Sequence, residues 1–157
     1  MANTYTQIYL HLVFAVYKRE NLIPHAAKTR LFRYITGIIQ HPKRNHKLHA
    51  INGMPDHIHI LLGLHPAQGV SDLVRDIKSN STLFINKEGL VPRRFAWQVG
   101  YGAFSYGRSQ LSQVIEYICR QEEHHRKRTF REEYEELLNR FDVGYNSEYL
   151  FEWIEDI

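Results

Sequence analysis

The central stretch of this chain reads Asn52-Gly53-Met54-Pro55-Asp56-His57-Ile58-His59-Ile60-Leu61-Leu62. It opens with Asn-Gly and Pro-Asp, which favour turns, and continues as an aliphatic run interrupted only by His59. Because side chains alternate across a strand, His57 and His59 project from one face, and Ile58 and Ile60 from the other. Two neighbouring imidazoles on a rigid strand form half of a site for a divalent metal. The alternative is a histidine pair on a solvated sheet face.

The residues before this stretch predict a strand, a helix and a second strand. Alternation from Thr4 to Tyr17 indicates a long first strand, whose apolar face carries Ile8, Leu10, Leu12, Phe14 and Val16. Pro24 opens a helix that ends near His41-Pro42 and carries apolar residues at helical spacing, namely Leu31, Ile35, Ile38 and Ile39. A second strand, at about Lys47 to Asn52, is expected to turn through Asn52-Gly53 into the histidine strand.

The residues after the histidine strand predict a second helix, a fourth strand and a third helix. Ser71 or Asp72 caps the second helix, whose inner face carries Leu73, Ile77 and Phe84. The aromatic stretch from Phe95 to Tyr106 indicates a strand with a bend at Gly100 or Gly102. A third helix runs from Ser109 to about His125. The order β-α-β-β-α-β predicts an α+β, ferredoxin-like fold with an antiparallel sheet and an added C-terminal helix that carries a tyrosine.

Composition excludes several classes of protein. A single cysteine, Cys119, rules out an intrachain disulfide framework and a cysteine-rich zinc site, which suits a reducing cytoplasm. The N-terminal residues show no signal peptide. No apolar stretch approaches the roughly 20 residues that span a bilayer, so no membrane partner is expected.

Charge is distributed unevenly along the chain. Residues 1–130 hold 18 basic and 8 acidic residues, a net charge of +10, whereas residues 131–157 hold 2 basic and 9 acidic residues, a net charge of −7. We therefore expect a domain at residues 1–130 and an acidic C-terminal extension at residues 131–157. A basic body of this kind favours a polyanionic partner, most often nucleic acid. The alternative is a solvated surface with an acidic tail folded across it.

The helix after Ser109 carries a second pair of reactive side chains. Tyr117 and Gln121 are four residues apart, so they lie on the same edge of the helix, beside an apolar stripe formed by Leu111, Val114, Ile115 and Ile118. Tyrosine offers an oxygen nucleophile, and glutamine offers an amide oxygen as a hard metal ligand. The alternative is a tyrosine half-packed on the core beside a surface glutamine.

Four motifs occur in order along the chain: Pro55-Asp56-His57-Ile58-His59, Lys78-Ser79-Asn80-Ser81, Trp97-Gln98-Val99-Gly100-Tyr101-Gly102-Ala103-Phe104-Ser105 and Tyr117-Ile118-Cys119-Arg120-Gln121. This ordered set resembles the single-tyrosine HUH transposases of small insertion sequences, the two-hundred/six-hundred-and-five group, together with their repeat-associated tyrosine relatives. The resemblance covers roughly residues 5–130. The acidic tail after Phe130 is less standard for this family.

The resemblance implies a function and a set of roles. His57, His59 and Gln121 would hold Mg²⁺ or Mn²⁺, and Tyr117 would attack single-stranded DNA that carries hairpin ends. The product would be a 5′-phosphotyrosine link with a free 3′-hydroxyl, which can rejoin because one ester replaces another. The family also implies a homodimer in which active sites can form in trans, acting on DNA inside a bacterial or archaeal cell. No G-x-x-x-x-G-K-[ST] loop is present, so no nucleotide cofactor is expected.

Basic and aromatic residues supply candidate DNA contacts. Single-strand binding combines positive charge with stacking aromatics, for which Tyr101, Phe104 and Tyr106 are candidates. The candidate basic contacts are Lys43, Arg44, Lys47, Arg75, Lys78, Arg93 and Arg94. Two alternatives stay open: a non-catalytic ferredoxin-like module that binds RNA or single-stranded DNA, and a metal-dependent hydrolase that uses water and forms no tyrosyl link.

Overall fold

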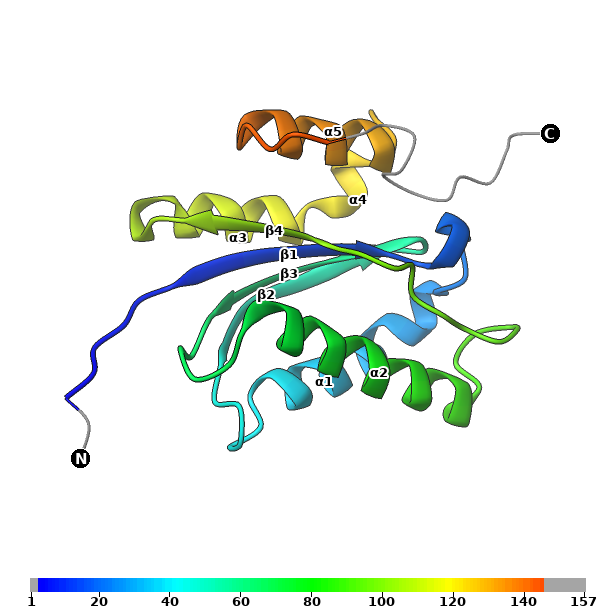
Figure 1. Cartoon of the computed structure of the whole chain (residues 1–157). Helices are drawn as coiled ribbons and strands as arrows, with labels where there is room; N and C mark the ends of the chain where they lie inside the picture. Colours follow the sequence, from blue (N-terminus) through cyan, green and yellow to red (C-terminus); the bar gives the residue numbers. More distant parts are fainter. Residues whose placement is uncertain (1–2, 146–157) are drawn as a thin grey trace.

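Figure 1 shows the fold as a computed structural model, which describes residues 3–145. The strands are β1 (Tyr9–Ala15), β2 (Lys47–Met54), β3 (His57–Gly63) and β4 (Gly102–Tyr106). The helices are α1 (Lys28–Ile39), α2 (Val70–Glu88), α3 (Leu111–Cys119), α4 (Gln121–His124) and α5 (Phe130–Arg140). Three short 3-10 turns lie at Tyr17–Arg19, His25–Ala27 and Arg108–Gln110.

The four strands form one antiparallel sheet in the order β2-β3-β1-β4. Helix α1 connects β1 to β2, and α2 connects β3 to β4, with one antiparallel strand between the members of each connected pair. This is the predicted ferredoxin-like arrangement, and α3 is the added helix that carries Tyr117. The predicted fold class is therefore confirmed.

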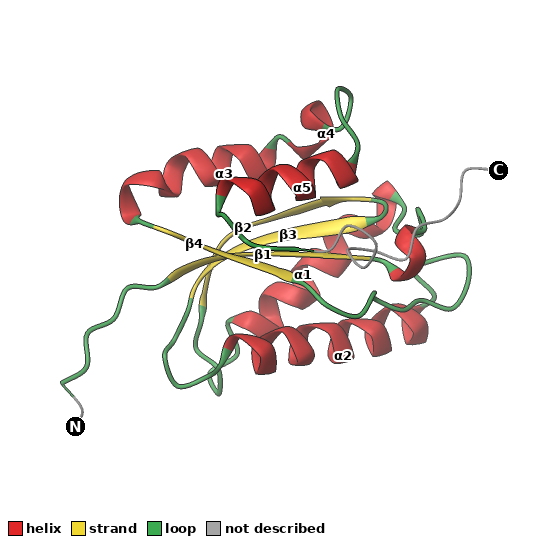
Figure 2. Cartoon of the chain, turned by 45° about the horizontal axis from the view of Figure 1, so that its top comes forward, coloured by secondary structure: helices red, strands yellow, loops and turns green. Residues whose placement is uncertain are grey.

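Helices cover both faces of the sheet (Figure 1, Figure 2), with α1 and α2 on one side and α3 and α5 on the other. Ile58, Ile60 and Leu62 of β3 belong to the core against α1 and α2. Leu61 packs against α3 on the opposite face. Since side chains alternate, His57 and His59 share the face of Leu61 and lie beneath α3 and α5.

The turn into the histidine strand lies later than predicted. Asn52 and Gly53 are part of β2 and pair with His59 and Ile58, while Pro55 and Asp56 form the turn. The prediction of a turn through Asn52-Gly53 is therefore wrong. Gly53 instead allows β2 and β3 to approach each other closely, because a Cβ at this position would overlap the backbone oxygen of His57.

Strands β1 and β4 are shorter than predicted. β1 begins at Tyr9 rather than Thr4, and residues 3–8 are exposed. β4 covers only Gly102–Tyr106, and the preceding segment meets the sheet at a single bridge between Trp97 and Val16. The positive φ of 95° at Gly100 provides the predicted bend.

The predicted helix from Ser109 to His125 is interrupted at Arg120, where φ is −101° and ψ is 27°. The side-chain amide of Asn52 donates to the carbonyl oxygens of Ile118 and Cys119 at 2.9 and 3.3 Å. These carbonyls belong to the last turn of α3, which has no further turn of helix to donate to them. Asn52 therefore attaches the end of α3 to β2, and α4 starts afresh at Gln121.

Helix α5 lies in the acidic extension, for which the sequence predicted no element. It begins after Thr129, whose hydroxyl accepts from the backbone N–H of Glu132 in a capping box. Its apolar face packs against Val13, Ala15 and Phe104, contributing Phe130, Tyr134, Leu137 and Leu138. The predicted domain boundary at residue 130 stays a prediction, and residues 146–157 of the extension lie outside the described range.

Candidate active site

Strand β3 presents two completely buried imidazoles to the helices above it. His57 donates from Nδ1 to a carboxylate oxygen of Asp56 at 2.7 Å, because a carboxylate can only accept. This bond fixes the ring so that Nε2 points away from Asp56, toward the Oε1 atom of Gln121 at 3.2 Å. His57 also stacks on Phe130, with ring centroids 3.8 Å apart. The strand therefore holds the Nε2 atom of His57 in a defined direction.

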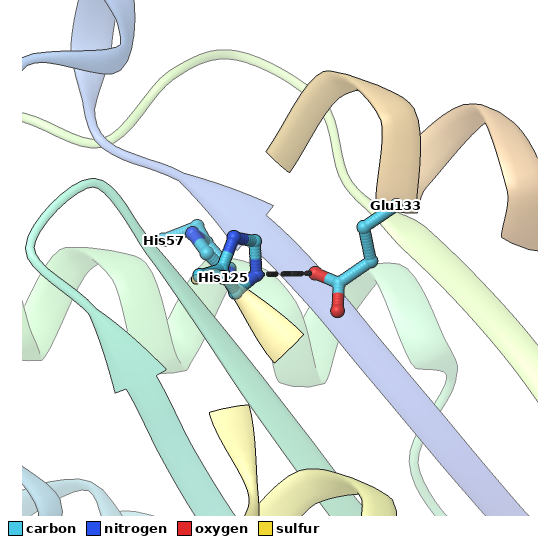
Figure 3. Close-up of side chains that lie close together, drawn as sticks. All are labelled: His57, His125 and Glu133. Atoms are coloured by element: carbon cyan, nitrogen blue, oxygen red, sulfur yellow. Dashed lines mark hydrogen bonds and ion pairs between the residues drawn. The ribbon is translucent and has the colours of Figure 1, made fainter. Parts of the chain in front are cut away.

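The centre of the site is Glu133, which α5 contributes. Its side chain is completely buried, and its Oε1 atom lies 3.0 Å from Nε2 of His59. The same oxygen lies 3.1 Å from Nε2 of His125 and 3.5 Å from Nε2 of His57. Figure 3 shows His57, His125 and Glu133 gathered from three separate elements. One carboxylate oxygen thus faces three imidazole nitrogens.

The nucleophile candidate lies on the other side of the same carboxylate. The hydroxyl of Tyr117 donates to Oε2 of Glu133. The amide of Gln121 donates to this oxygen at 3.2 Å, and the guanidinium of Arg128 donates to the Tyr117 oxygen at 3.3 Å. The ring of Tyr117 stacks on His124, with centroids 4.5 Å apart. The tyrosine hydroxyl and the histidine cluster are therefore joined through a single side chain.

Burial and neighbouring charges shift the pKa values of His57, His59 and Glu133 in opposite directions. Burial lowers the pKa of His57, but its contacts with Asp56 and Glu133 outweigh burial and raise that pKa to about 8. Burial lowers the pKa of His59 despite the nearby carboxylate. Burial raises the pKa of Glu133, but the surrounding histidines outweigh it and hold that pKa far below the usual range. Without a metal, the site therefore contains a carboxylate opposite a protonated His57.

Burial, and then the negative charge of Glu133, raise the pKa of Tyr117 well above its ordinary value. The phenol is thus firmly protonated while Glu133 accepts its hydrogen bond. For Tyr117 to act as a nucleophile, its pKa must fall. A cation bound to Glu133 would lower it, because the cation would neutralise part of the carboxylate charge.

The donor atoms fit a divalent ion. Ligand atoms of His57, His125 and Glu133 all lie within 4.8 Å of one another. The separations of 3.0 and 3.1 Å from Glu133 to His59 and His125 also match adjacent ligands of a six-coordinate ion, about 3 Å apart for bonds of about 2.1 Å. Imidazole and carboxylate together suit Mn²⁺ and Mg²⁺, as well as Zn²⁺. The residues present are consistent with the metal that the sequence predicted.

Comparison with known proteins identifies the family. A family model described as "Transposase IS200 like" matches residues 4–121 of the chain. The chain belongs to the IS200-like transposase family. Among curated proteins, none matches the sequence. The resemblance inferred from the ordered motifs is therefore confirmed at the level of the family.

Two solved structures share the fold of this IS200-like chain. A protein from Deinococcus radiodurans R1, solved as a candidate transposase, is 21% identical, with a TM-score of 0.61. The match covers 77% of this chain and 95% of that one. A REP-associated tyrosine transposase, solved bound to a REP hairpin, is 18% identical, with a TM-score of 0.55, over 80% of this chain and 73% of that one. At these identities the two likenesses show the fold alone.

The structure brings together all four residues for which the sequence predicted a role at the centre of the site. His57, His59, Tyr117 and Gln121 meet around Glu133, although Tyr117 and Gln121 lie on separate helices. Their roles in this IS200-like protein stay predictions. The geometry adds Glu133 and His125 as candidate ligands beside Gln121.

Sequence reasoning missed Glu133, His125 and Arg128. Glu133 had a detectable signal, because it is a charged residue within the apolar stripe of an amphipathic segment that starts with a capping box at Thr129-x-x-Glu132. Arg128 lies in the basic run Arg126-Lys127-Arg128, which gave no sign that one of its members contacts the Tyr117 hydroxyl. His125 was used only to mark the end of the third helix.

The predicted DNA contacts are not gathered around the histidines. Arg75 and Lys78 lie on α2, on the opposite side of the sheet, and Arg75 pairs with Asp72 at 3.2 Å. Arg44 pairs with Asp76 at 3.0 Å, and Arg93 pairs with Glu20. Lys43, Lys47 and Arg94 are exposed. Their role as DNA contacts stays a prediction.

Lys78 has a structural role that its motif did not predict. Its ammonium donates to the carbonyl oxygens of Gln98 and Gly100 at 2.7 and 2.6 Å. Nearby, Ser81 accepts a hydrogen bond from the indole of Trp97 at 2.9 Å. Two of the four motifs therefore bind each other and hold the segment before β4 against α2.

Within residues 3–145, no helix has the length and apolarity to cross a membrane.

Proposed function

We propose that this protein cleaves and rejoins single-stranded DNA through a covalent 5′-phosphotyrosine intermediate on Tyr117. One observation carries the proposal: the Tyr117 hydroxyl and three imidazole nitrogens contact the two oxygens of the same buried carboxylate, Glu133. This arrangement puts an oxygen nucleophile beside a cluster of metal ligands. Membership of the IS200-like family supports the same chemistry.

The reaction exchanges one phosphate ester for another. The phenolic oxygen of Tyr117 attacks phosphorus, its proton passes to Glu133 or to water, and the bond between phosphorus and the 3′-oxygen breaks. The 3′-oxygen leaves with a proton as a free hydroxyl, and the reverse attack by such a hydroxyl rejoins the strand. Arg128, which donates to the Tyr117 oxygen, would face the charge that develops on the phosphate. A bound Mg²⁺ or Mn²⁺ would supply Lewis-acid stabilisation of that phosphate.

His57 and His59 would hold this metal from β3, with Glu133 as the anionic ligand. Gln121 and His125 flank Glu133 from different sides and compete for a further ligand position. Calorimetric titration with Mn²⁺ separates them: substitution by alanine of the residue that binds the ion should cost more affinity than the roughly 10- to 100-fold expected for a residue that only contacts a ligand. His124→Ala is the matched control for His125→Ala, since His124 stacks on Tyr117 rather than facing Glu133.

Single-stranded DNA with hairpin ends is the proposed substrate, and a homodimer is the proposed assembly. A fold relative was solved bound to a REP hairpin, and residues 1–130 of this chain carry a net charge of +10. Binding should weaken with salt by about 0.7 in log–log slope for each phosphate neutralised. A preference for plain duplex over a hairpin-bearing single strand in a gel-shift assay contradicts the proposed substrate.

Trapping the covalent intermediate tests the proposal. Single strands copied from the palindromes that flank the coding region, labelled at the 3′ end, are incubated with the protein and Mn²⁺ and then denatured. We expect a labelled protein band that disappears in Tyr117→Phe and persists in Tyr106→Phe, a control at another half-buried tyrosine. Cleavage with no protein band indicates a hydrolase, and binding with no cleavage in any metal indicates a non-catalytic module.

A further inference from the structure

His11 on β1 is a buried histidine for which the proposed chemistry has no use so far. Its side chain is completely buried, and its Nε2 atom lies 2.7 Å from Nδ1 of His59. The two rings stack with centroids 5.0 Å apart. In the register of the sheet His59 pairs with Val13, so His11 is its diagonal neighbour on the same face. His11 therefore touches His59 on the side of the ring that faces away from Glu133.

A hydrogen bond between two neutral imidazoles contains a single proton, which leaves two arrangements. If His11 donates, His59 carries its proton on Nε2 and donates it to Glu133. This is the arrangement without a metal, because the Glu133 carboxylate 3.0 Å away can only accept. If His59 donates from Nδ1, its Nε2 atom faces Glu133 as a bare lone pair. Only the second arrangement allows Nε2 of His59 to bind a metal.

The second arrangement requires that His11 accept at Nε2 and carry its own proton on Nδ1. When a metal takes the place of the Nε2 proton of His59, the proton of His11 must move from Nε2 to Nδ1. Among the described residues, no hydrogen-bond partner lies at Nδ1 of His11, so no donor at that atom opposes this change. His11 can therefore adopt the form that His59 needs. By contrast, Asp56 can only accept from His57, and so it fixes that ring in one form.

We propose that His11 is a positioning residue: when a metal is bound, Nε2 of His11 accepts a hydrogen bond from Nδ1–H of His59 and so directs the Nε2 lone pair of His59 into the metal site. The proposal rests on the metal site of the proposed function. His11 is a neutral partner, so it orients His59 without adding a third negative charge beside Asp56 and Glu133. It does not touch the reacting atoms and acts through His59 alone.

Mn²⁺ binding by the full-length protein, measured by calorimetry and by the electron paramagnetic resonance of free Mn²⁺, tests this role. His11→Phe keeps a planar ring but lacks the acceptor, and we expect a loss of about 10- to 100-fold in Mn²⁺ affinity. His11→Gln keeps an acceptor in its amide oxygen, and we expect affinity within about threefold of wild type. A merely structural role of the ring predicts the opposite order, with Gln more harmful than Phe. If His11→Phe does not fold, His11→Leu replaces it with the same expected loss.

His46→Phe is the matched control. His46 is also buried and hydrogen-bonded, but its partners are Gln68 and the backbone of His65. The His46→Phe variant should lose thermal stability and keep the Mn²⁺ affinity of the wild type. If His46→Phe weakens Mn²⁺ binding as much as His11→Phe does, the effect of His11 is general destabilisation and the proposal is overturned.

Nitrogen-15 spectra of the histidines give a second readout that stability does not affect. With diamagnetic Mg²⁺ or Zn²⁺ bound, we expect protons on Nδ1 of both His59 and His11. A proton on Nε2 of His11 in that state overturns the proposal. The outcomes also separate the two levels of inference: if the wild type binds no divalent metal, the metal site itself is wrong. If the wild type binds and His11→Phe binds equally well, only the role of His11 is wrong.

Discussion

The hydroxyl of Tyr117 donates a hydrogen bond to Oε2 of Glu133, whose Oε1 atom lies 3.0 Å from Nε2 of His59. Glu133 therefore separates the candidate nucleophile from the histidine cluster by the width of one carboxylate. Tyr117 lies on α3 and Glu133 on α5, and both helices follow the β-α-β-β-α-β core in the chain. Their contact makes the last described helix part of the site.

Replacing Glu133 with glutamine should lower the pKa of Tyr117. The carboxylate charge and its hydrogen bond both favour the protonated phenol, and an uncharged amide removes the charge. We expect a fall of about one unit or more, measured as phenolate absorbance in the metal-free protein. The titration of a Glu133→Gln, Tyr117→Phe double variant is subtracted to isolate Tyr117. An unchanged midpoint would show that burial alone sets this pKa.

Mn²⁺ affinity should rise with pH up to about 8. Contacts with Asp56 and Glu133 raise the pKa of His57 to about 8 although burial opposes them, so a proton occupies His57 below that pH. The metal must displace this proton, and its apparent affinity should fall about tenfold for each pH unit below 8. Calorimetry between pH 6 and 8.5 measures the slope, and a flat profile over that range would remove His57 from the ligand set.

Asn52→Ala should destabilise the protein and slow adduct formation. The substitution removes the donor that holds the end of α3, at a cost of about 1 to 3 kcal/mol in the free energy of unfolding for the carbonyls left unpaired. Asn80→Ala is the control, because the Asn80 amide also donates to a backbone carbonyl, that of Asp76 on α2. Both variants should lose stability in urea titrations, but only Asn52→Ala should slow the covalent reaction at a temperature where both are folded.

The sequence was sufficient to predict the fold because its patterns are local. Alternation in β1 and the apolar stripes of α1 and α3 identify faces that pack in the core without any knowledge of their partners. The H-x-H pair likewise predicted side chains that meet in the structure. Tyr117 and Gln121 also meet, although the single helix that their spacing assumed is broken at Arg120. These signals depend on periodicity, which the sequence displays directly.

The errors arose where a distant contact overrides a local signal. Asn52-Gly53 is a strong turn pair, yet Gly53 is required by the approach of His57 across the sheet. No glycine or proline marks the break at Arg120, which coincides with the hydrogen bonds from Asn52 on β2. Glu133 approaches His59 across 74 residues of sequence, a separation at which no local pattern identifies a partner.

Mixing two inactive variants shows whether each site is built from one chain. The structure joins Tyr117 to the histidines of the same chain, so a heterodimer of His57→Ala and Tyr117→Phe should stay inactive, with one defect in every site. A different affinity tag on each variant verifies that heterodimers have formed, and wild type taken through the same exchange should still form adduct. Recovery in the mixture of the two variants, with the DNA on the His57→Ala chain, would instead show that the tyrosine helix acts in trans.

Locating the covalent bond between protein and DNA shows whether Tyr117 is the nucleophile. The trapped adduct is digested with nuclease and trypsin, and the peptide from Ser109 to Arg120, in which Tyr117 is the only tyrosine, is sequenced by mass spectrometry. The account predicts that this peptide carries a nucleotide joined through its 5′-phosphate to Tyr117, and that the other DNA fragment ends in a free 3′-hydroxyl. A nucleotide on any other residue, or cleavage that leaves only free 5′-phosphate ends, would contradict it.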